Sequence, residues 1–150
     1  MSIFPTKILL ATDGSREAEL AGQTAADLAQ KTDSELHVVH VLASPLATHD
    51  PSSFEPEVWA CLEQRERESE RKTLEDVVAK IEASGGKVED SHHTAGRPDA
   101  EIVALAEEIG AGLIVMGARG VGRIRRALTG SVSDSVVRHA HCPVLVVREE

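Results

Sequence analysis

Aromatic side chains are scarce in this sequence of 150 residues. They are Phe4, Phe54 and Trp59, 2% of the chain, and there is no tyrosine. Proteins that bind single-stranded nucleic acid stack its bases on such side chains, and the net charge of −9 repels polyanions. We therefore expect no nucleic acid partner and a core built from aliphatic side chains.

Cysteines and long apolar runs are also few. Cys61 and Cys142 lie far apart and form no C-x-x-C pair, which excludes a disulfide framework and a thiolate zinc site. No stretch approaches the roughly 18 apolar residues of a membrane span, and the start of the chain lacks the apolar region of a signal peptide. We expect a cytoplasmic protein with no membrane partner, forming one domain over residues 1–150.

Short aliphatic runs alternate with helical patterns along the chain. The runs cover residues 8–11, 36–42, 113–116 and 144–147. They are too short for helices and too apolar for strands with one wet face, so they predict strands covered on both sides. Helices are predicted between them at residues 15–31, 57–84, 98–109 and about 132–139. The charged middle of the second helix, residues 63–72, should face solvent.

Residues 87–94 contain little that is apolar and predict a fifth strand, at a sheet edge. Strict alternation of strands and helices predicts an α/β fold with right-handed crossovers. We expect a single open, mostly parallel five-stranded sheet of order 3-2-1-4-5, with helices on both faces. In such a sheet the ligand crevice lies at the carboxyl ends of the first and fourth strands, where the chain order reverses.

Two loops border that crevice, residues 11–15 and residues 116–133. In the second loop, glycines allow close approach of the backbone, and Gly130, Ser131 and Ser133 stand at the start of the last helix, where an anion is favoured. Arg119, Arg123, Arg125 and Arg126 make the segment locally basic. Together these features predict a phosphate site, although glycines and serines also punctuate ordinary loops. Neither a Walker sequence nor a G-x-G-x-x-G follows the first strand.

Two further residues have an ordinary structural interpretation beside a functional one. Asp13, at the end of the first strand, suits ribose hydroxyls or a magnesium ion carried by phosphates. It equally suits an Asx turn before the helix. Val41 offers an apolar wall to a base, or is simply a core valine.

The spacing Gly117-x2-Gly120-x9-Gly130-Ser131 resembles the nucleotide signature of the universal stress protein family, in its ATP-binding branch. Residues 8–15, 36–41 and 141–147 also look like the family's opening, second and closing strands. The resemblance covers nearly the whole chain.

The resemblance implies ATP binding, with Mg²⁺ carried by the phosphates. It implies that Ala11, Thr12 and Val41 border adenine, that Asp13 lies by the ribose and phosphates, and that Met116 and Gly117 line the nucleotide. Phosphate contacts are implied for Gly120, Gly130, Ser131, Val132 and Ser133, and we add the neighbouring Arg119. A homodimer through the last strand, Val144 to Val147, is also implied, and an exposed apolar edge strand needs such a cover.

No catalytic set is recognisable, and we predict none. The serines have no evident histidine and aspartate relay. His139, His141 and Cys142 straddle the predicted end of a helix and the start of a strand, with no partner cluster. His92 and His93, as consecutive strand residues, point to opposite faces and cannot hold one ion together, so we predict no metal site. The sequence favours an ATP-binding regulatory stress-response protein, a nucleotide-dependent homodimeric switch read by an unknown protein partner. The alternative is a slow ATPase or a nucleotide-transferring enzyme using the same site.

Overall fold

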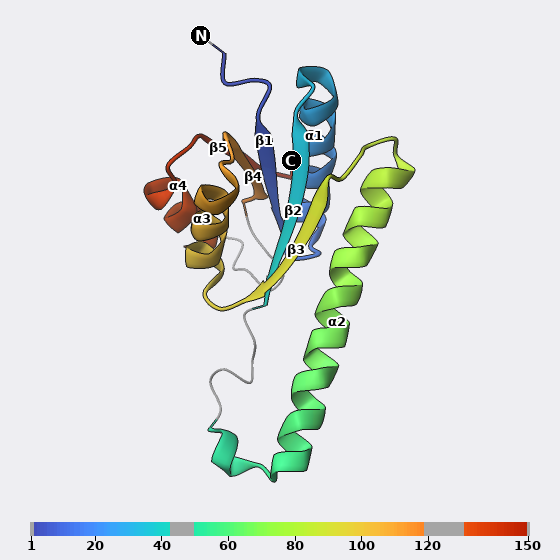
Figure 1. Ribbon diagram of the computed structural model, residues 1–150, viewed down its shortest axis with the longest axis vertical. Coiled ribbons are helices and arrows are strands. Elements are labelled where there is room, and N and C mark those ends of the chain that lie inside the picture. The colour runs from blue at the N-terminus through green and yellow to red at the C-terminus, as the bar shows by residue number, and fades with distance from the viewer. Residues whose placement is uncertain (1, 43–49, 119–130, 150) are drawn as a thin grey trace.

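The computed structural model describes residues 2–42, 50–118 and 131–149. Strands and helices alternate along the chain, as Figure 1 shows. The elements are β1 (Lys7–Thr12), α1 (Arg16–Thr32), β2 (Glu35–Leu42), the 3-10 helix η2 (Pro51–Ser53), α2 (Pro56–Ala83), β3 (Asp90–Ala95), α3 (Pro98–Ile109), β4 (Leu113–Gly117), α4 (Ser131–His139) and β5 (Val144–Val147).

The five strands form one parallel sheet in the order β3-β2-β1-β4-β5, which confirms the predicted α/β fold. The register places Ala11 of β1 beside Met116 of β4, and Thr12 beside His40 of β2. The carboxyl ends of the three central strands therefore meet at one edge of the sheet, where a parallel α/β fold binds ligands.

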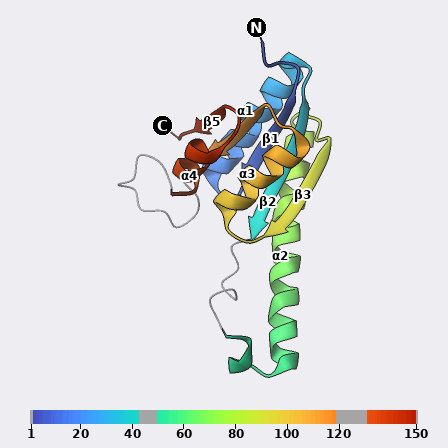
Figure 2. The same ribbon diagram turned by 60° about the vertical axis from the view of Figure 1, so that its left-hand side comes forward.

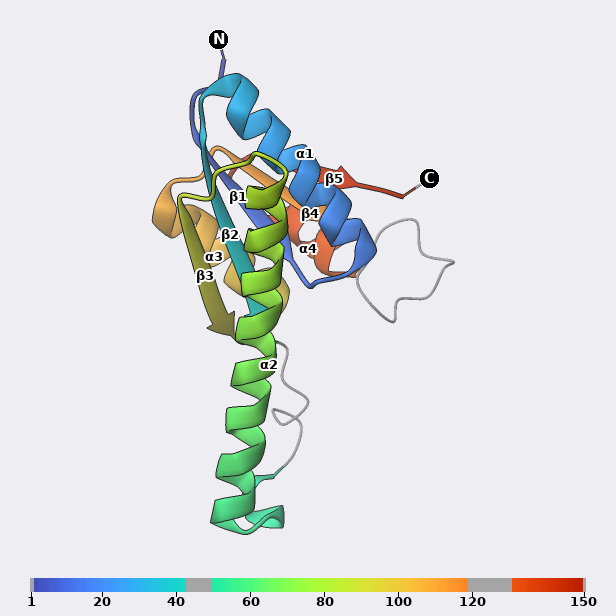
Figure 3. The ribbon, with the colours of Figure 1, turned by 90° about the vertical axis from the view of Figure 1, so that its right-hand side faces the viewer.

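Helices cover the sheet on both sides. Figure 3 shows α1 and α2 in front of the strands, and Figure 2 shows α3 and α4 on the opposite face. Each face has its own core. On the first, Leu10, Val38 and Val115 pack with residues of α1 and α2. On the second, Leu9, Val39 and Ile114 pack with residues of α3 and α4. Burial on both faces explains why the central strands are almost continuously apolar.

Helix α1 begins where the sequence predicts. Ser15 is its N-cap, and the Ser15 hydroxyl accepts a hydrogen bond from the backbone N–H of Ala18 at 3.2 Å. The face toward the sheet is made of small residues, Ala21 and Ala25 among them, both fully buried. Small side chains let the helix axis approach the strands closely, which fixes the position of the turn between β1 and α1.

Helix α2 is the longest element, and its amino-terminal half extends beyond the sheet (Figure 1). Only Leu74 and Ile81 are buried, both in its second half. Most of the charged middle is exposed as expected. Glu70 departs from that expectation, because its side chain turns toward the sheet and is only 24% exposed.

The predicted bounds of the third strand are wrong at the amino-terminal side. The ladder covers Asp90–Ala95, whereas residues 87–94 were expected. The chain leaves α2 at Gly85 and Gly86 and must cross from the helix layer to the sheet edge, and Glu89 forms a bend on the way. Its N–H donates to the Leu36 carbonyl at 2.8 Å, just before the regular ladder begins. Helices α2 and α4 each begin one residue earlier than expected.

Strand β5 forms one edge of the sheet and pairs with β4 on its inner side. Its Leu145 side chain is 36% exposed. Among the helices of the described residues, none combines the length and the apolar character that a membrane span requires.

Candidate functional site

A tight turn joins β1 to α1 at the predicted crevice. The N–H of Gly14 donates to Thr12 Oγ1 at 3.2 Å, and the N–H of Ser15 donates to Asp13 Oδ1 at 2.9 Å. Gly14 has φ +78°, and a Cβ there would lie 2.9 Å from Thr73 Cγ2 of α2. Glycine is required at this position by both conformation and space.

Asp13 does form the Asx turn that the sequence allowed. The bond from Ser15 occupies Oδ1, while the side chain as a whole is exposed at the mouth of the crevice. The turn does not need Oδ2. The two interpretations of Asp13 are therefore compatible, because one oxygen shapes the loop and the carboxylate still faces outward.

An apolar wall lies beside this turn, on the sheet face that α3 and α4 cover. Ala11 and Met116 are neighbours in the ladder, 7% and 5% exposed. Val41 of β2 and Val132 of α4 pack against the same cluster. Ala11 and Val41, which were predicted to border adenine, thus share one apolar cluster with Met116 and Val132. Thr12, the third residue of that prediction, lines a pocket on the opposite face of the sheet.

Gly117 ends β4 and lies against α1. A Cβ on Gly117 would lie 3.0 Å from the carbonyl carbon of Glu17 and 3.1 Å from the backbone nitrogen of Ala18. No side chain fits there without moving the first turn of the helix. This glycine therefore has a packing role that the sequence pattern did not reveal.

The amino end of α4 lies close to the end of β4. Ser133 is buried, and its hydroxyl donates to the Ala118 carbonyl at 3.1 Å, which fastens α4 to the residue after β4. Ser131, the first residue of the helix, is exposed. An anion at this helix end is favoured by the helix dipole, and the exposed Ser131 hydroxyl lies at the same end.

The remaining predicted site residues lie outside the described part of the chain. They are Arg119, Gly120 and Gly130, together with the basic residues Arg123, Arg125 and Arg126.

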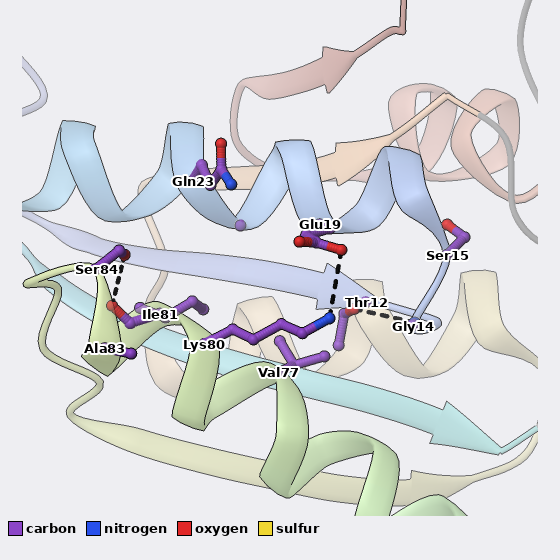
Figure 4. Close-up of a pocket in the computed structure, with 11 residues that line it drawn as sticks. Thr12, Gly14, Ser15, Glu19, Gln23, Val77, Lys80, Ile81, Ala83 and Ser84 are labelled. Carbon is purple, nitrogen blue, oxygen red and sulfur yellow. Dashed lines mark hydrogen bonds and ion pairs between the residues drawn. The ribbon is translucent and has the colours of Figure 1, made fainter.

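A separate pocket of about 380 Å³ lies between α1 and α2. Figure 4 shows Lys80 reaching across it from α2, with Nζ 3.5 Å from Glu19 Oε2 of α1. Thr12, Gly14 and Ser15 line one end. The pocket shares that turn with the crevice, but it opens on the opposite sheet face from the wall of Ala11 and Met116.

Histidine clusters were missed at the sequence level. His92 and His93 do point to opposite faces, as expected, but each meets other ligand-type side chains there. His93 joins His40 and Glu70 on the α2 face, and His92 joins His37 and Asp90 on the α3 face. Only the register between β2 and β3 creates these groups, so no local spacing in the sequence could have predicted them.

His40 is the most buried of the histidines in these clusters, at 4% exposed. Its Nδ1 lies 2.8 Å from Glu70 Oε2. Burial lowers the pKa of His40 below its ordinary value, opposed by the nearby Glu70 carboxylate, and the His93 ring lowers it further.

Comparison with known proteins gives a consistent result. Residues 5–148 match the family model described as the universal stress protein family. A putative universal stress protein of Staphylococcus epidermidis is 38% identical over 146 residues, which cover 95% of this chain and 84% of that protein.

Solved structures agree with this match. Universal stress protein UspA from Lactobacillus plantarum superposes with a TM-score of 0.83 at 27% identity, over 98% of this chain and 100% of that one. A universal stress protein from Archaeoglobus fulgidus in complex with dAMP gives a TM-score of 0.66 at 28% identity, over 97% and 99% of the two chains.

Proposed function

This chain belongs to the universal stress protein family, and from that premise we propose that it binds ATP at the carboxyl ends of β1 and β4. One observation carries the proposal: an apolar wall and a polar turn meet at the same sheet edge. The wall of Ala11 and Met116 suits an adenine ring, and the exposed Asp13 carboxylate beside it suits ribose hydroxyls.

The phosphates would extend toward the amino end of α4. There the helix dipole and the exposed Ser131 hydroxyl favour an anion. Gly120, Gly130 and Arg119 complete the proposed phosphate contacts on the strength of the sequence signature. Carboxylate oxygens are the ligands that Mg²⁺ prefers, so the outward-facing Asp13 fits a magnesium ion carried by those phosphates.

The relative solved with dAMP supports an adenine nucleotide as the ligand class. The base and sugar of dAMP are those of deoxyadenosine, so this relative supports binding of the adenine moiety. A triphosphate is our own extension, based on the length of the glycine signature and on the local excess of arginines.

We propose regulation rather than turnover as the role of the bound nucleotide. General-base catalysis of hydrolysis needs a carboxylate oriented toward water. A carboxylate that is engaged with ribose hydroxyls or Mg²⁺, as we propose for Asp13, is a poor general base for that water. We therefore propose that the nucleotide sets a conformation that a protein partner recognises. The two free thiols favour a reducing compartment such as the cytoplasm.

A homodimer through β5 completes the proposal. Among the described residues, no strand pairs with the outer edge of β5, and Leu145 on one face of that strand is 36% exposed. An apolar edge strand is a ready template for pairing. Two copies joined by a two-fold axis would cover both edges at once. Leu145→Glu should shift the protein to monomer in light scattering after size exclusion, whereas a wild-type monomer at all concentrations would contradict the dimer.

The nucleotide proposal is tested on protein purified without added nucleotide. Denaturation followed by chromatography and mass spectrometry identifies any released small molecule, and thermal shift with Mg²⁺ and ATP, ADP, AMP or cyclic AMP ranks the ligands. At a hundredfold excess over Kd the ligand adds about 2.7 kcal/mol of stability, a clearly visible shift. No released nucleotide and no shift with any of the four would contradict the proposal.

Asp13→Asn is the informative variant because the amide oxygen can still accept the bond from Ser15. It removes only the charge, and we expect about tenfold weaker binding of Mg²⁺·ATP, equivalent to about 1.4 kcal/mol. Asp27→Asn is the matched control, since Asp27 is an exposed residue of α1 paired only with Lys31 among the salt bridges of described residues. If Asp13→Asn instead spares binding and abolishes phosphate release from ATP, the slow ATPase alternative is favoured.

A further inference from the structure

Three ligand-type side chains from three different elements converge on the α2 face of the sheet. They are His40 of β2, Glu70 of α2 and His93 of β3, and their ligand atoms all lie within 4.8 Å of one another. His40 Nδ1 and Glu70 Oε2 are 2.8 Å apart. The rings of His40 and His93 are stacked, with centroids 5.9 Å apart and planes inclined by 2°.

Among the residues that the structure describes, none makes a hydrogen bond to Nδ1 of His40, the buried member of this group. His40 Nδ1 is inaccessible to solvent, and despite its closeness to Glu70 the geometry makes no hydrogen bond there. Buried polar atoms in native proteins nearly always have a partner, because an unsatisfied one destabilises the fold. Coordination to a cation would satisfy this nitrogen.

We propose that His40, Glu70 and His93 bind one divalent transition-metal ion of the zinc type. Two imidazoles and one carboxylate are a common zinc donor set, in which bonds of about 2.0–2.2 Å leave a fourth position for water. The exposed His93 side gives the ion access to solvent. Glu70 and His93 reach bonding distance by small side-chain rotations, since the ligand atoms are already grouped.

The bound ion would tie α2 to β2 and to the edge strand β3. Glu70 precedes the two buried residues of α2, Leu74 and Ile81. His40 is the ladder neighbour of Thr12, which begins the turn at the nucleotide crevice. The metal site therefore stands directly behind that crevice, yet none of its three ligands belongs to the proposed nucleotide contacts.

The second cluster, on the α3 face, is the weaker candidate. His92 Nε2 already lies 3.5 Å from His37 Nδ1, and His37 Nε2 lies 3.4 Å from Glu35 Oε2. Its carboxylate, Asp90, is 62% exposed. These nitrogens have hydrogen-bond partners, whereas in the described part of the chain His40 Nδ1 has only the close Glu70 carboxylate, without hydrogen-bond geometry.

Zinc binding is tested on the full chain, stripped with EDTA and kept free of nucleotide. Zn²⁺ is titrated in competition with a chromophoric chelator, and Co²⁺ is used as a spectroscopic probe of four-coordinate geometry. We expect one equivalent of Zn²⁺ per chain, intense visible Co²⁺ bands and a zinc-dependent rise in Tm. Because no nucleotide is present, failure here is distinguishable from failure of ATP binding.

Two variants assign the ligands. His93→Gln changes an exposed side chain, and Glu70→Gln keeps the size of the carboxylate while removing its charge. Removing an outer-shell partner of a metal ligand weakens metal binding by up to about a hundredfold. Each variant removes a direct ligand, so we expect it to weaken zinc binding by more than that. His92→Gln, the adjacent residue on the opposite face, is the matched control and should bind as wild type.

Circular dichroism and Tm of the metal-free protein verify that each variant is folded. If His93→Gln does not fold, the zinc affinity of Glu70→Gln tests the proposal. The proposal is overturned if the wild type takes up no Zn²⁺, or if both variants retain wild-type affinity. Loss of binding in His92→Gln alone also overturns it, since the ion would then sit on the α3 face.

Discussion

Gly117, at the end of β4, packs directly against Glu17 in the first turn of α1. A Cβ atom on Gly117 would lie 3.0 Å from the Glu17 carbonyl carbon and 3.1 Å from its Cβ. The contact joins the fourth strand to the helix that follows the first, across the proposed nucleotide crevice. Packing between two elements thus requires a glycine at this position, apart from the nucleotide contact that we propose for it.

Gly117→Ala should destabilise the protein even without nucleotide. The added methyl group meets backbone atoms, which cannot rotate away, and such overpacking typically costs about 1–3 kcal/mol. Urea unfolding of the nucleotide-free protein measures the loss. Unchanged stability together with lost ATP binding would mean that the glycine serves the ligand alone.

Gly22→Ala is the control for a glycine replacement in the same region. Gly22 lies inside α1, and its added Cβ would meet Leu10 Cδ2 at 3.5 Å, an ordinary contact. Alanine is the better helix former, so we expect a gain of about 0.5–1 kcal/mol in the same urea experiment. A loss of stability would show that the interface between α1 and the sheet has no room for a methyl group.

Ser133→Ala should lower stability more than Ser131→Ala. The buried Ser133 hydroxyl donates to the Ala118 carbonyl, and removing the donor to a buried acceptor costs about 1–3 kcal/mol. Ser131 is exposed, and its replacement should chiefly weaken nucleotide binding. Denaturation without ligand and thermal shift with Mg²⁺·ATP separate the two effects. Equal loss of stability in both variants would contradict this assignment.

Helices α3 and α4 are joined by a hydrogen bond that should depend on pH. The Ser135 hydroxyl donates to Asp99 Oδ2 at 2.7 Å, and this bond, aided by Arg97, holds the pKa of Asp99 below its usual value of about 3.9. As pH falls, the unfolded chain takes up the proton first. The stabilisation is therefore complete above the usual value and is lost as pH falls through the lowered pKa.

Ser135→Ala should move the pKa of Asp99 upward, measurable by NMR titration of its carboxyl carbon. Urea unfolding measures the difference in free energy of unfolding between Ser135→Ala and the wild type. This difference should be largest near neutral pH and should shrink below about pH 3.9. Ser69→Ala, at an exposed site of α2, serves as the control. A pKa of Asp99 that does not move in Ser135→Ala would contradict the assignment.

The two thiols should differ in reactivity. Cys61 is exposed, whereas Cys142 is partly covered, and burial raises the pKa of the Cys142 thiol. The thiolate is the reactive form of cysteine, and a raised pKa lowers the fraction of thiolate at neutral pH. A maleimide at pH 7 should therefore label Cys61 first, with Cys61→Ser and Cys142→Ser identifying each phase by mass spectrometry. Faster labelling of Cys142 would contradict the prediction.

Local sequence patterns predicted most of the fold because strands, helices and helix caps depend largely on residues that are close in sequence. The apolar runs at 8–11 and 113–116 could only be strands buried on both faces, and Ser15 could be recognised as a helix cap. The third strand was misplaced at its start because polar residues carry little strand signal, and the crossing from α2 to the sheet edge determines where the ladder begins.

The sequence by itself determined the order of elements, the sheet topology and the edge at which we propose that a nucleotide binds, since each follows from periodicity and chain order. Only the tertiary structure decided the contact of Gly117 with Glu17 and the grouping of His40, Glu70 and His93. These residues lie tens of positions apart, and their meeting depends on strand register and helix packing. Register is fixed by the whole buried sheet, which no local pattern encodes.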